Sequence, residues 1–451
     1  MKNQVLWLGA KLSLLSIALA VSLPPAAAKP KQVLLVSVTK GFRHDVIPTT
    51  DKLVEELARK SGKFTVDYVR TEQDMTQKMT AAALKQYDAV IFNNTTGDLP
   101  LPDREAFLAW IRSGKGFVGF HAATDTFPGF PGYIDLIGAQ FKTHHEQAEV
   151  EVLIQDPKHP ATKHFTGPFR VKDEIYLVKN FYREKVHGLL WLDKHPNFGI
   201  PGDYAIAWCK DYGKGRVFYT SLGHRTDVVA RPDIQQHYLG GILWALGLEK
   251  GNAVPQSTKT VLSPQEAKDG FRPLFDGVNL TGWKLRDPTG TKSWNVQNGM
   301  LVNEIGKQIG LEHGTDLVSE DKFWNFTVRF DYMMPKGANS GFYLRGRHEI
   351  QLLDDGDSTT ASNTSNGSIY NFAAPTTFAS RKAGQWQTVE ATIIDNRITV
   401  TLNGVKIHDN LPCDRPTGGE LDANVKTPGP ILLQGDHGAV AFRNLRLKTL
   451  K

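Results

Sequence analysis

The chain has 451 residues, of which 40% are hydrophobic and 22% are charged. This composition is typical of a soluble globular protein, and the length is too great for one ordinary core, so two domains are expected. The formal net charge is +6 at pH 7. Since no dense run of Lys and Arg is interleaved with aromatic residues, nucleic acid is not an expected partner.

The first 28 residues have the pattern of a secretory signal peptide. An apolar run at 12–23 follows two lysines, and the three alanines at 26–28 offer a small-residue cleavage site. The alternative is an uncleaved membrane anchor, but the run is short for a span and Pro24 follows it closely. We therefore expect an exported protein, periplasmic or extracellular, with no membrane contact after signal cleavage.

Residues 29–250 alternate apolar runs with helical patterns. Apolar runs at 33–38, 89–92 and 117–120 are typical of strands, and helical spacing occurs at 49–60 and 103–112. Continuous apolar runs indicate strands that are covered on both faces, so a mainly parallel sheet is predicted. In such sheets ligands bind at the carboxyl ends of the strands.

Histidines gather on the loops expected at these strand ends. His121 ends a strand abruptly before small residues, as functional residues do in strand-to-helix elbows. Neutral imidazoles with a carboxylate could bind a divalent metal, or they could act in acid–base chemistry and sugar binding. No compact spacing such as H-E-x-x-H decides between these interpretations. The candidate residues of this half are His44, His121, His145, Glu174 and His224.

Four motifs in this half resemble the trehalose-utilisation (ThuA-like) family. They lie at 41–44, 119–124, 173–176 and 221–225. The resemblance implies an α/β flavodoxin-like fold of the class I glutamine amidotransferase-like kind, in which His121 stands where the amidotransferases have their cysteine. It also implies a role in sugar metabolism, without fixing a reaction.

The pattern changes after residue 250. Residues 251–270 are rich in Lys, Gln, Ser and Pro and are predicted to be a linker. Residues 271–451 contain short alternating strands separated by Asp-Asn and Asn-Gly turns, which predicts a β-sandwich or jelly roll. The two cysteines, Cys209 and Cys413, fall in different predicted domains, so neither a disulfide nor a thiolate metal site is expected.

One stretch of the second half, 339–355, carries most of the polar groups suited to a ligand. Taken as one extended strand, it places Phe342, Leu344, His348, Ile350 and Leu352 on one face and Tyr343, Arg345, Arg347, Glu349 and Gln351 on the other. The polar face suits a polyhydroxylated ligand such as a sugar, or is a solvated face with a cross-strand ion pair. Gly346 leaves open a bulge or turn that would reset the alternation.

Residues 349–354 are similar to the carboxylate strand of the laminarinase and lichenase glycosidases, but Gln351 replaces the middle acidic residue of those enzymes. A closer resemblance, carried by 274–283, 339–345, 349–354 and 433–438, is to the 3-keto-disaccharide hydrolase family. It implies a concanavalin-like jelly roll that acts on glycosides oxidised to a ketone at the third sugar carbon. The expected partner is therefore a small-molecule or oligosaccharide substrate.

A ketone acidifies the neighbouring C–H bond, so a single general base is enough to expel the group on the anomeric carbon, after which water adds. We expect Glu349 or His437 to be this base and Arg345 to stabilise the enolate oxygen. The remaining candidates, for substrate binding, are Gln351, Tyr370, Asn339 and Asp354.

Two other functions fit the same sequence. A jelly-roll lectin shares the aromatic and polar surface residues, and would bind glycans without cleaving them. Alternatively, catalysis could belong to the N-terminal histidines, with the sandwich as a targeting module. No cofactor is firmly implied, and a divalent metal is possible.

Overall fold

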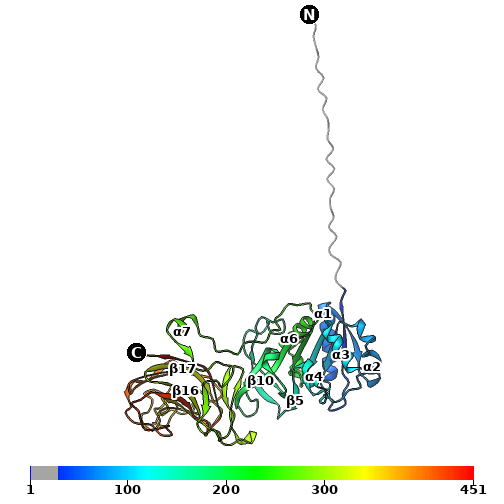
Figure 1. The fold of residues 1–451 in the computed structure, drawn as a ribbon. Helices are drawn as coiled ribbons and strands as arrows, with labels where there is room; N and C mark the ends of the chain where they lie inside the picture. The colour runs from blue at the N-terminus through cyan, green and yellow to red at the C-terminus, as the bar shows by residue number, and fades with distance from the viewer. Residues whose placement is uncertain (2–28) are drawn as a thin grey trace.

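The computed structural model describes residue 1 and residues 29–451. The predicted signal peptide therefore lies outside the described residues, apart from residue 1. Figure 1 shows an α/β domain, coloured blue to green, beside a strand-rich domain coloured green to red. Within 29–451, none of the helices has both the length and the apolar character needed to span a membrane.

A nine-stranded sheet forms the centre of the N-terminal domain, in the order β2-β1-β3-β4-β11-β10-β9-β6-β7. The first five strands pair in parallel, and the last four continue the sheet in antiparallel pairs. The short strands β5 and β8 pair separately. The strands are β1 (Lys31–Val36), β2 (Phe64–Val69), β3 (Ala89–Asn93), β4 (Gly116–Phe120), β5 (Gln140–Thr143), β6 (Ala148–Ile154), β7 (Phe169–Asp173), β8 (Leu177–Lys179), β9 (His187–Lys194), β10 (Pro201–Tyr212) and β11 (Gly215–Thr220).

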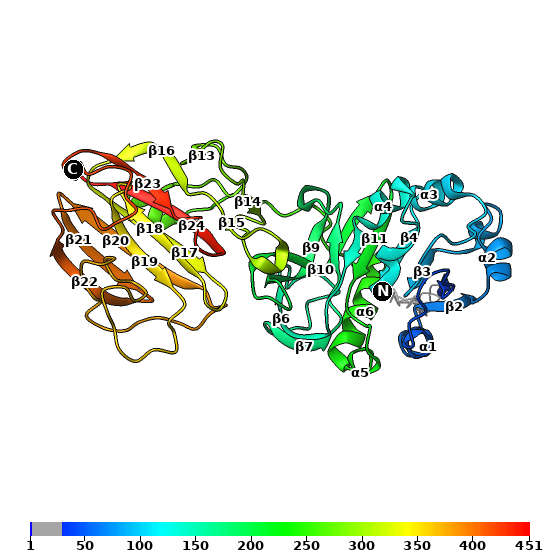
Figure 2. The same ribbon diagram turned by 90° about the horizontal axis from the view of Figure 1, so that it is seen from below.

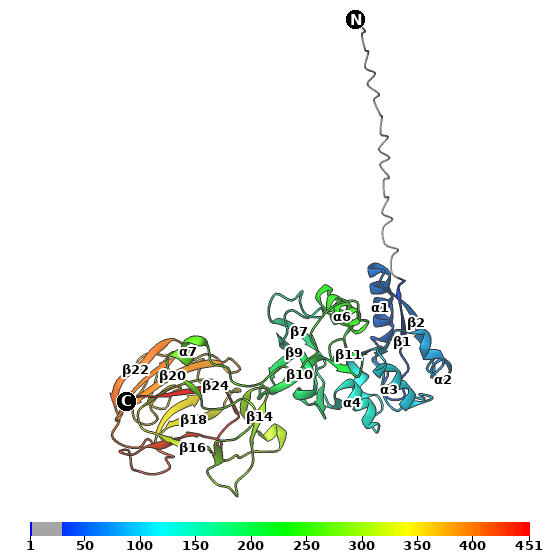
Figure 3. The same ribbon diagram turned by 45° about the horizontal axis from the view of Figure 1, so that its top comes forward.

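Helices cover both faces of this sheet because its strands are apolar on both faces. In β1, Val33 and Leu35 pack in one core with α1 and α6, whereas Leu34 and Val36 pack in a second core with α3 and α4. Figure 3 shows these helices packed around the strands. The helices are α1 (Ile47–Ser61), α2 (Glu72–Lys78), α3 (Arg104–Arg112), α4 (Pro131–Ile137), α5 (Thr226–Val229) and α6 (Pro232–Ala245), with 3-10 turns η1 (Ala83–Gln86), η2 (His121–Asp125) and η3 (Arg183–Lys185).

Two antiparallel sheets form the C-terminal domain (Figure 2). One has the order β14-β15-β24-β17-β20-β21-β22, with β12 also paired to β24, and the other has the order β13-β16-β23-β18-β19. Their facing apolar side chains form one core. The elements are α7 (Pro264–Lys268), β12 (Arg272–Pro273), β13 (Trp283–Leu285), β14 (Trp294–Gln297), β15 (Met300–Asn303), η4 (Lys307–Ile309), β16 (Leu317–Phe323), β17 (Phe326–Met333), β18 (Asn339–Leu344), β19 (His348–Leu353), β20 (Gln387–Ile394), β21 (Arg397–Leu402), β22 (Val405–Pro412), β23 (Gly429–Leu433) and β24 (Val440–Thr449).

The prediction of one continuous strand at 339–355 is wrong, because the chain reverses between β18 and β19. Arg345 and Gly346 adopt φ values of 56° and 66°, which allow a tight connection. In the resulting hairpin Tyr343 pairs with Glu349 and Gly341 pairs with Gln351. The expected apolar face is confirmed, because its five residues still lie on one side, but the two arginines lie in the turn.

The domains meet through polar and apolar contacts. Trp386 Nε1 donates to Asp193 Oδ2 (2.8 Å), and Lys194 Nζ donates to the carbonyl of Gly384 (2.8 Å). The apolar part joins Ile200 to C-terminal residues, namely Ile305 and Ala439, with Phe198 and Leu311 packed against them. Both cysteines are buried and free.

Candidate functional site

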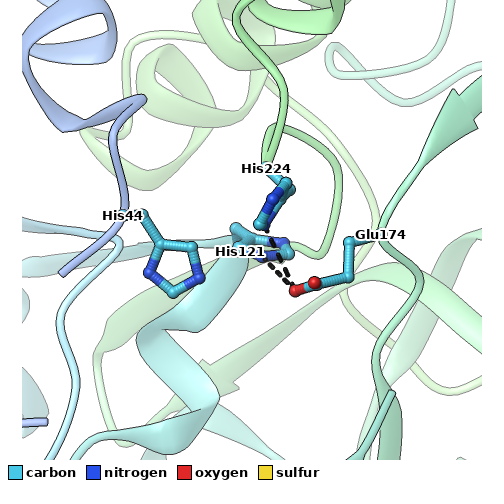
Figure 4. A group of neighbouring side chains, drawn as sticks. All are labelled: His44, His121, Glu174 and His224. Atoms are coloured by element: carbon cyan, nitrogen blue, oxygen red, sulfur yellow. Dashed lines mark ion pairs between the residues drawn. The ribbon is translucent and has the colours of Figure 1, made fainter. Parts of the chain in front are cut away.

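Four side chains converge at the carboxyl ends of the parallel strands. His44 follows β1, His121 follows β4 and His224 follows β11, while Glu174 follows β7. One ligand-type atom from each side chain can be chosen so that all four lie within 4.8 Å of one another. Figure 4 shows the four side chains close together, with ion pairs from Glu174 to His121 and His224. We call His44, His121, Glu174 and His224 the three-histidine cluster.

His121 is held in place by its backbone and by one ring nitrogen. Its φ of 42° is uncommon for a residue with a Cβ atom and aims the ring away from the strand direction. Nδ1 lies 2.7 Å from the carbonyl oxygen of Ser221, which can only accept, so Nδ1 carries the proton. Nε2 therefore faces the cluster, 3.4 Å from Glu174 Oε2.

The loop that carries His224 is fixed by a buried carboxylate. Asp173 accepts hydrogen bonds from the backbone N–H groups of Gly223 (2.7 Å) and Arg225 (3.2 Å). This arrangement places His224 Nδ1 3.2 Å from Glu174 Oε2. Burial is the main reason why the pKa of Asp173 is raised above its usual range.

Burial also keeps His44 neutral. It lowers the pKa of His44 to about 3, and the neighbouring His121 and His224 add to this effect. Burial alone would raise the pKa of Glu174, but contacts with the same two imidazoles outweigh it, so the pKa is lowered overall. The contact with Glu174 has the opposite effect on His224, because it raises the pKa of that imidazole.

His145, predicted to belong with these residues, lies outside the cluster. Its ring packs against His195 (5.3 Å between centroids) and Phe198 (4.8 Å). The reason is that 144–147 run past the cluster toward the domain boundary, and it is His144 that faces Glu174, with Nδ1 3.4 Å from Oε1.

In the C-terminal domain, the carboxylate of Glu349 lies on the face of the five-stranded sheet that points away from the core. The residue is only 2% exposed. The Tyr343 hydroxyl donates to Glu349 Oε2 (2.8 Å), and the Gln351 amide, turned so that its nitrogen faces acceptors, donates to Oε1 (3.1 Å). Two neutral donors therefore hold the carboxylate in one orientation.

The surroundings of Glu349 raise its pKa to about 7. Burial is the main cause, and the charges of Asp316 and Asp436 act in the same direction, while the Tyr343 hydrogen bond and His437 oppose it. His437 is half-exposed and pairs with Asp436. The structure thus brings together Glu349, His437 and Gln351 from the predicted set.

Arg345 is not part of this group, so its predicted place on the face of Glu349 is wrong. Because it lies in the turn, its side chain runs to the opposite side, where Nε donates to the carbonyl of Trp324 (2.7 Å) and the guanidinium stacks on that indole (3.6 Å). Its remaining donors reach Asn396 and Asn325.

The other predicted substrate-binding residues lie at different distances from Glu349. Tyr370 is adjacent, because its N–H donates to the Glu349 carbonyl (3.0 Å) and its ring is partly exposed. Asn339 is on the same sheet face, four residue pairs further along the hairpin, beside Gly438. Asp354 is not brought to the site, since its carboxylate accepts from the Gly337 N–H (2.8 Å) at the hairpin end.

A loop around Gly419 covers the Tyr343–Glu349 pair. A Cβ atom on Gly419 would lie 2.6 Å from the Tyr343 oxygen, and its φ is 66°, so glycine is required there. Arg286 fixes the loop by donating to the Gly419 and Glu420 carbonyls (both 2.9 Å) and pairs with Asp316 (3.1 Å).

Comparison with known proteins identifies both domains. The sequence model of the trehalose utilisation (ThuA) family matches residues 32–245, and that of the 3-keto-alpha-glucoside-1,2-lyase-like domain matches residues 270–448. The chain is a fusion of these two domains. These matches support a carbohydrate-active enzyme.

Individual relatives cover one domain or less. A 3-keto-disaccharide hydrolase of Bacteroides thetaiotaomicron is 28% identical over 93 residues, which are 20% of this chain and only 32% of that protein. A provisionally named glycosyl hydrolase from Parabacteroides distasonis is 25% identical and is matched over 100% of its length and 43% of this chain, with a TM-score of 0.35. A provisionally named ThuA-like protein from Parabacteroides merdae is 21% identical over 94% of its length and 51% of this chain, with a TM-score of 0.42.

In the lyase-like domain, sequence reasoning misses the roles of three residues that shape the site. Tyr343 is placed on the polar face but given no role, and Asp316 and Arg286 come from segments far away in the sequence. No local signal identifies the last two, because the pairing of β13, β16, β23, β18 and β19 in one sheet brings them near Glu349. In chemical terms, the ThuA domain offers a set of metal-type ligands, and the lyase-like domain offers a base matched to neutral pH.

Proposed function

We propose that the chain is an exported enzyme of carbohydrate catabolism whose lyase-like domain cleaves 3-keto-glycosides, with Glu349 as the general base. The observation that carries this proposal is the buried Glu349 carboxylate, held by Tyr343 and Gln351, with a pKa of about 7. A base with this pKa is available at neutral pH and is still strong enough to remove a proton from carbon next to a ketone.

The reaction proceeds by elimination and addition. Glu349 takes the proton from the second sugar carbon, whose electrons form the enolate with the ketone at the third carbon. The enolate then expels the aglycone oxygen from the first carbon, and that oxygen takes up a proton. Addition of water across the new double bond returns a proton to the second carbon and gives net hydrolysis.

The residues around Glu349 have separate roles in this scheme. Since Arg345 is directed elsewhere, the group proposed to stabilise the enolate is His437, which lowers the pKa of Glu349. Gln351 and Tyr343 orient the base, and Tyr370 and Asn339 lie where they could bind sugar hydroxyls.

The same proposal includes the finer fold and the location. The parallel strand order β2-β1-β3-β4-β11 corresponds to the 2-1-3-4-5 order of flavodoxin-like sheets and supports that fold for residues 29–250. The two antiparallel sheets support a concanavalin-like jelly roll for 271–451, joined by 251–270. We further propose that residues 1–28 are a signal peptide and that the mature protein acts in the periplasm or outside the cell. Its proposed substrate is a small molecule or oligosaccharide, and neither a membrane nor a nucleic acid is a proposed partner.

The test is sugar release in deuterium oxide by the full mature chain, from a 3-keto-disaccharide and from its unoxidised parent. We expect release from the keto compound alone, with solvent deuterium at the second carbon of the product. Glu349→Gln should reduce the rate at least a hundredfold, whereas Glu320→Gln, an exposed carboxylate on the same sheet, should leave it unchanged.

Two results would refute the proposal. Equal rates for wild type and Glu349→Gln would remove Glu349 from the chemistry. Binding of ordinary glycans without release of sugar from either compound would indicate a lectin-like protein instead.

A further inference from the structure

The three-histidine cluster of the ThuA domain has no part in the reaction proposed for the lyase-like domain. Ring nitrogens of His44, His121 and His224 are buried and, among the described residues, have no hydrogen-bond partner. Those of His121 and His224 lie 3.2–3.4 Å from Glu174 Oε2 but are not aligned for hydrogen bonds with it. Buried polar atoms without partners are costly, so several in one place require an explanation.

The distances fit one bound ion. Nitrogen and oxygen ligands lie about 2.0–2.2 Å from a zinc-type ion, so neighbouring ligands in a tetrahedral site are about 3.4 Å apart. The separations from Glu174 to His121 (3.4 Å) and to His224 (3.2 Å) have this size. All four ligand atoms lie within 4.8 Å of one another, so the most widely separated pair would approach by up to about 1.4 Å to reach a tetrahedral spacing.

The hydrogen bond of His121 to Ser221 orients its other ring nitrogen toward Glu174. Nδ1 donates its proton to the Ser221 carbonyl, and Nε2 lies 3.4 Å from Glu174 Oε2. A metal ion between these two atoms would bind both of them. Metal-binding histidines commonly donate their other N–H to a carbonyl in this way, which fixes the ring and strengthens the ligand.

We propose that the three-histidine cluster binds one divalent transition-metal ion, and that the open side of the ion binds a sugar through two neighbouring oxygen atoms. Imidazole ligands favour zinc, iron or nickel over magnesium and calcium, which prefer all-oxygen sites. The four ligands come from loops after four different strands, and on the side toward the cavity His144 Nδ1 lies 3.4 Å from Glu174 Oε1.

A cavity of about 670 Å³ adjoins Glu174, which is the residue of the cluster that lines it. Its lining includes Lys172, Gln147 and Asn197, which can bind hydroxyl groups. Phe198 lines this cavity and also the groove between the domains that reaches His437. A sugar ketone is therefore the expected ligand, and this second part of the inference rests on the function proposed for the lyase-like domain.

The experiment uses the full mature chain, stripped of metal with a chelator and titrated with Co²⁺, whose visible absorption reports coordination by nitrogen ligands. We expect one Co²⁺ per chain with intense bands. His224→Gln and Glu174→Gln should each weaken binding at least tenfold. His145→Asn is the matched control, because its exposed ring is close to the cluster but not part of it, and should bind Co²⁺ as the wild type does.

Equal affinities in His224→Gln and His145→Asn, or bands like those of aqueous Co²⁺, would overturn the metal site. The sugar is tested next, by adding a 3-keto-disaccharide to Co²⁺-loaded Glu349→Gln protein, which should not consume it. A change in the Co²⁺ bands supports sugar binding at the ion, and unchanged bands overturn that part alone. Sugar release by the wild type, measured separately, decides the proposed function independently of both results.

Discussion

Replacing Glu349 with Gln should change how the stability of the protein depends on pH. The pKa of Glu349 rises from 4.5 to about 7 in the folded chain, chiefly because the carboxylate is buried. At about 1.4 kcal/mol for each pH unit, this difference corresponds to about 3 kcal/mol of folding free energy. The value is an upper limit, since water and nearby groups relax around a buried charge.

The sign follows from which form the folded protein prefers. Below pH 4.5 Glu349 is protonated in both folded and unfolded chains, so it imposes no penalty. Between pH 4.5 and about 7 only the unfolded chain ionises, and the folded state loses stability relative to it. Above pH 7 the full penalty of about 3 kcal/mol is present in the wild type but absent in Glu349→Gln.

Urea unfolding of the full chain at pH 4.5, 6 and 8 measures this effect through tryptophan fluorescence. We expect the free energy of unfolding of Glu349→Gln, relative to wild type, to increase by about 3 kcal/mol from pH 4.5 to pH 8. Any change in packing or neutral hydrogen bonding caused by the substitution cancels between the pH values, because it does not depend on pH. If the free energy of unfolding of Glu349→Gln relative to wild type does not change with pH, the reasoning is refuted. The same increase with pH in Glu320→Gln would also refute it.

Two further variants separate structure from chemistry. Arg345→Met should lower the free energy of unfolding by about 2–4 kcal/mol, because the Trp324 carbonyl loses its hydrogen-bond donor and the indole loses its stacked cation. The kcat of the folded enzyme should change less than about twofold. A stable but inactive variant would contradict the structural role of Arg345. Asp316→Asn removes a negative charge that raises the pKa of Glu349, so the rise of kcat/KM with pH should move to lower pH by less than about one unit. The exposed Asp357→Asn should leave that profile unchanged, and a shift of equal size in both variants would exclude the local effect.

Much of the fold can be predicted because its signals are local. The apolar run at 89–92 corresponds to β3 (Ala89–Asn93), and the helical pattern at 103–112 corresponds to α3 (Arg104–Arg112), which Asp103 caps through the Ala106 N–H. The hairpin is harder to predict because Arg345 adopts a positive φ, which its residue type does not signal, and only Gly346 marks the turn.

The candidate sites can be predicted in part, because some of their residues are marked by local sequence signals. His44, His121 and His224 follow apolar strands, so their meeting at one sheet edge follows from parallel pairing. The prediction that His145 lies with these histidines is wrong, because the path of its loop depends on packing at the domain boundary. The charges that tune Glu349 come from separate strands and loops, and tertiary pairing alone determines their positions.

The two sites differ in how far apart along the chain their residues lie. Glu349, Tyr343 and Gln351 belong to one hairpin and face each other once β18 and β19 pair. The three-histidine cluster collects residues between 44 and 224, so it exists only after most of the α/β domain has folded. Contacts between residues far apart in the sequence form more slowly than local contacts, so the two sites should form on different timescales when the chain refolds. One local strand pairing orients the Glu349 carboxylate, whereas the histidines come together only after long-range contacts have formed.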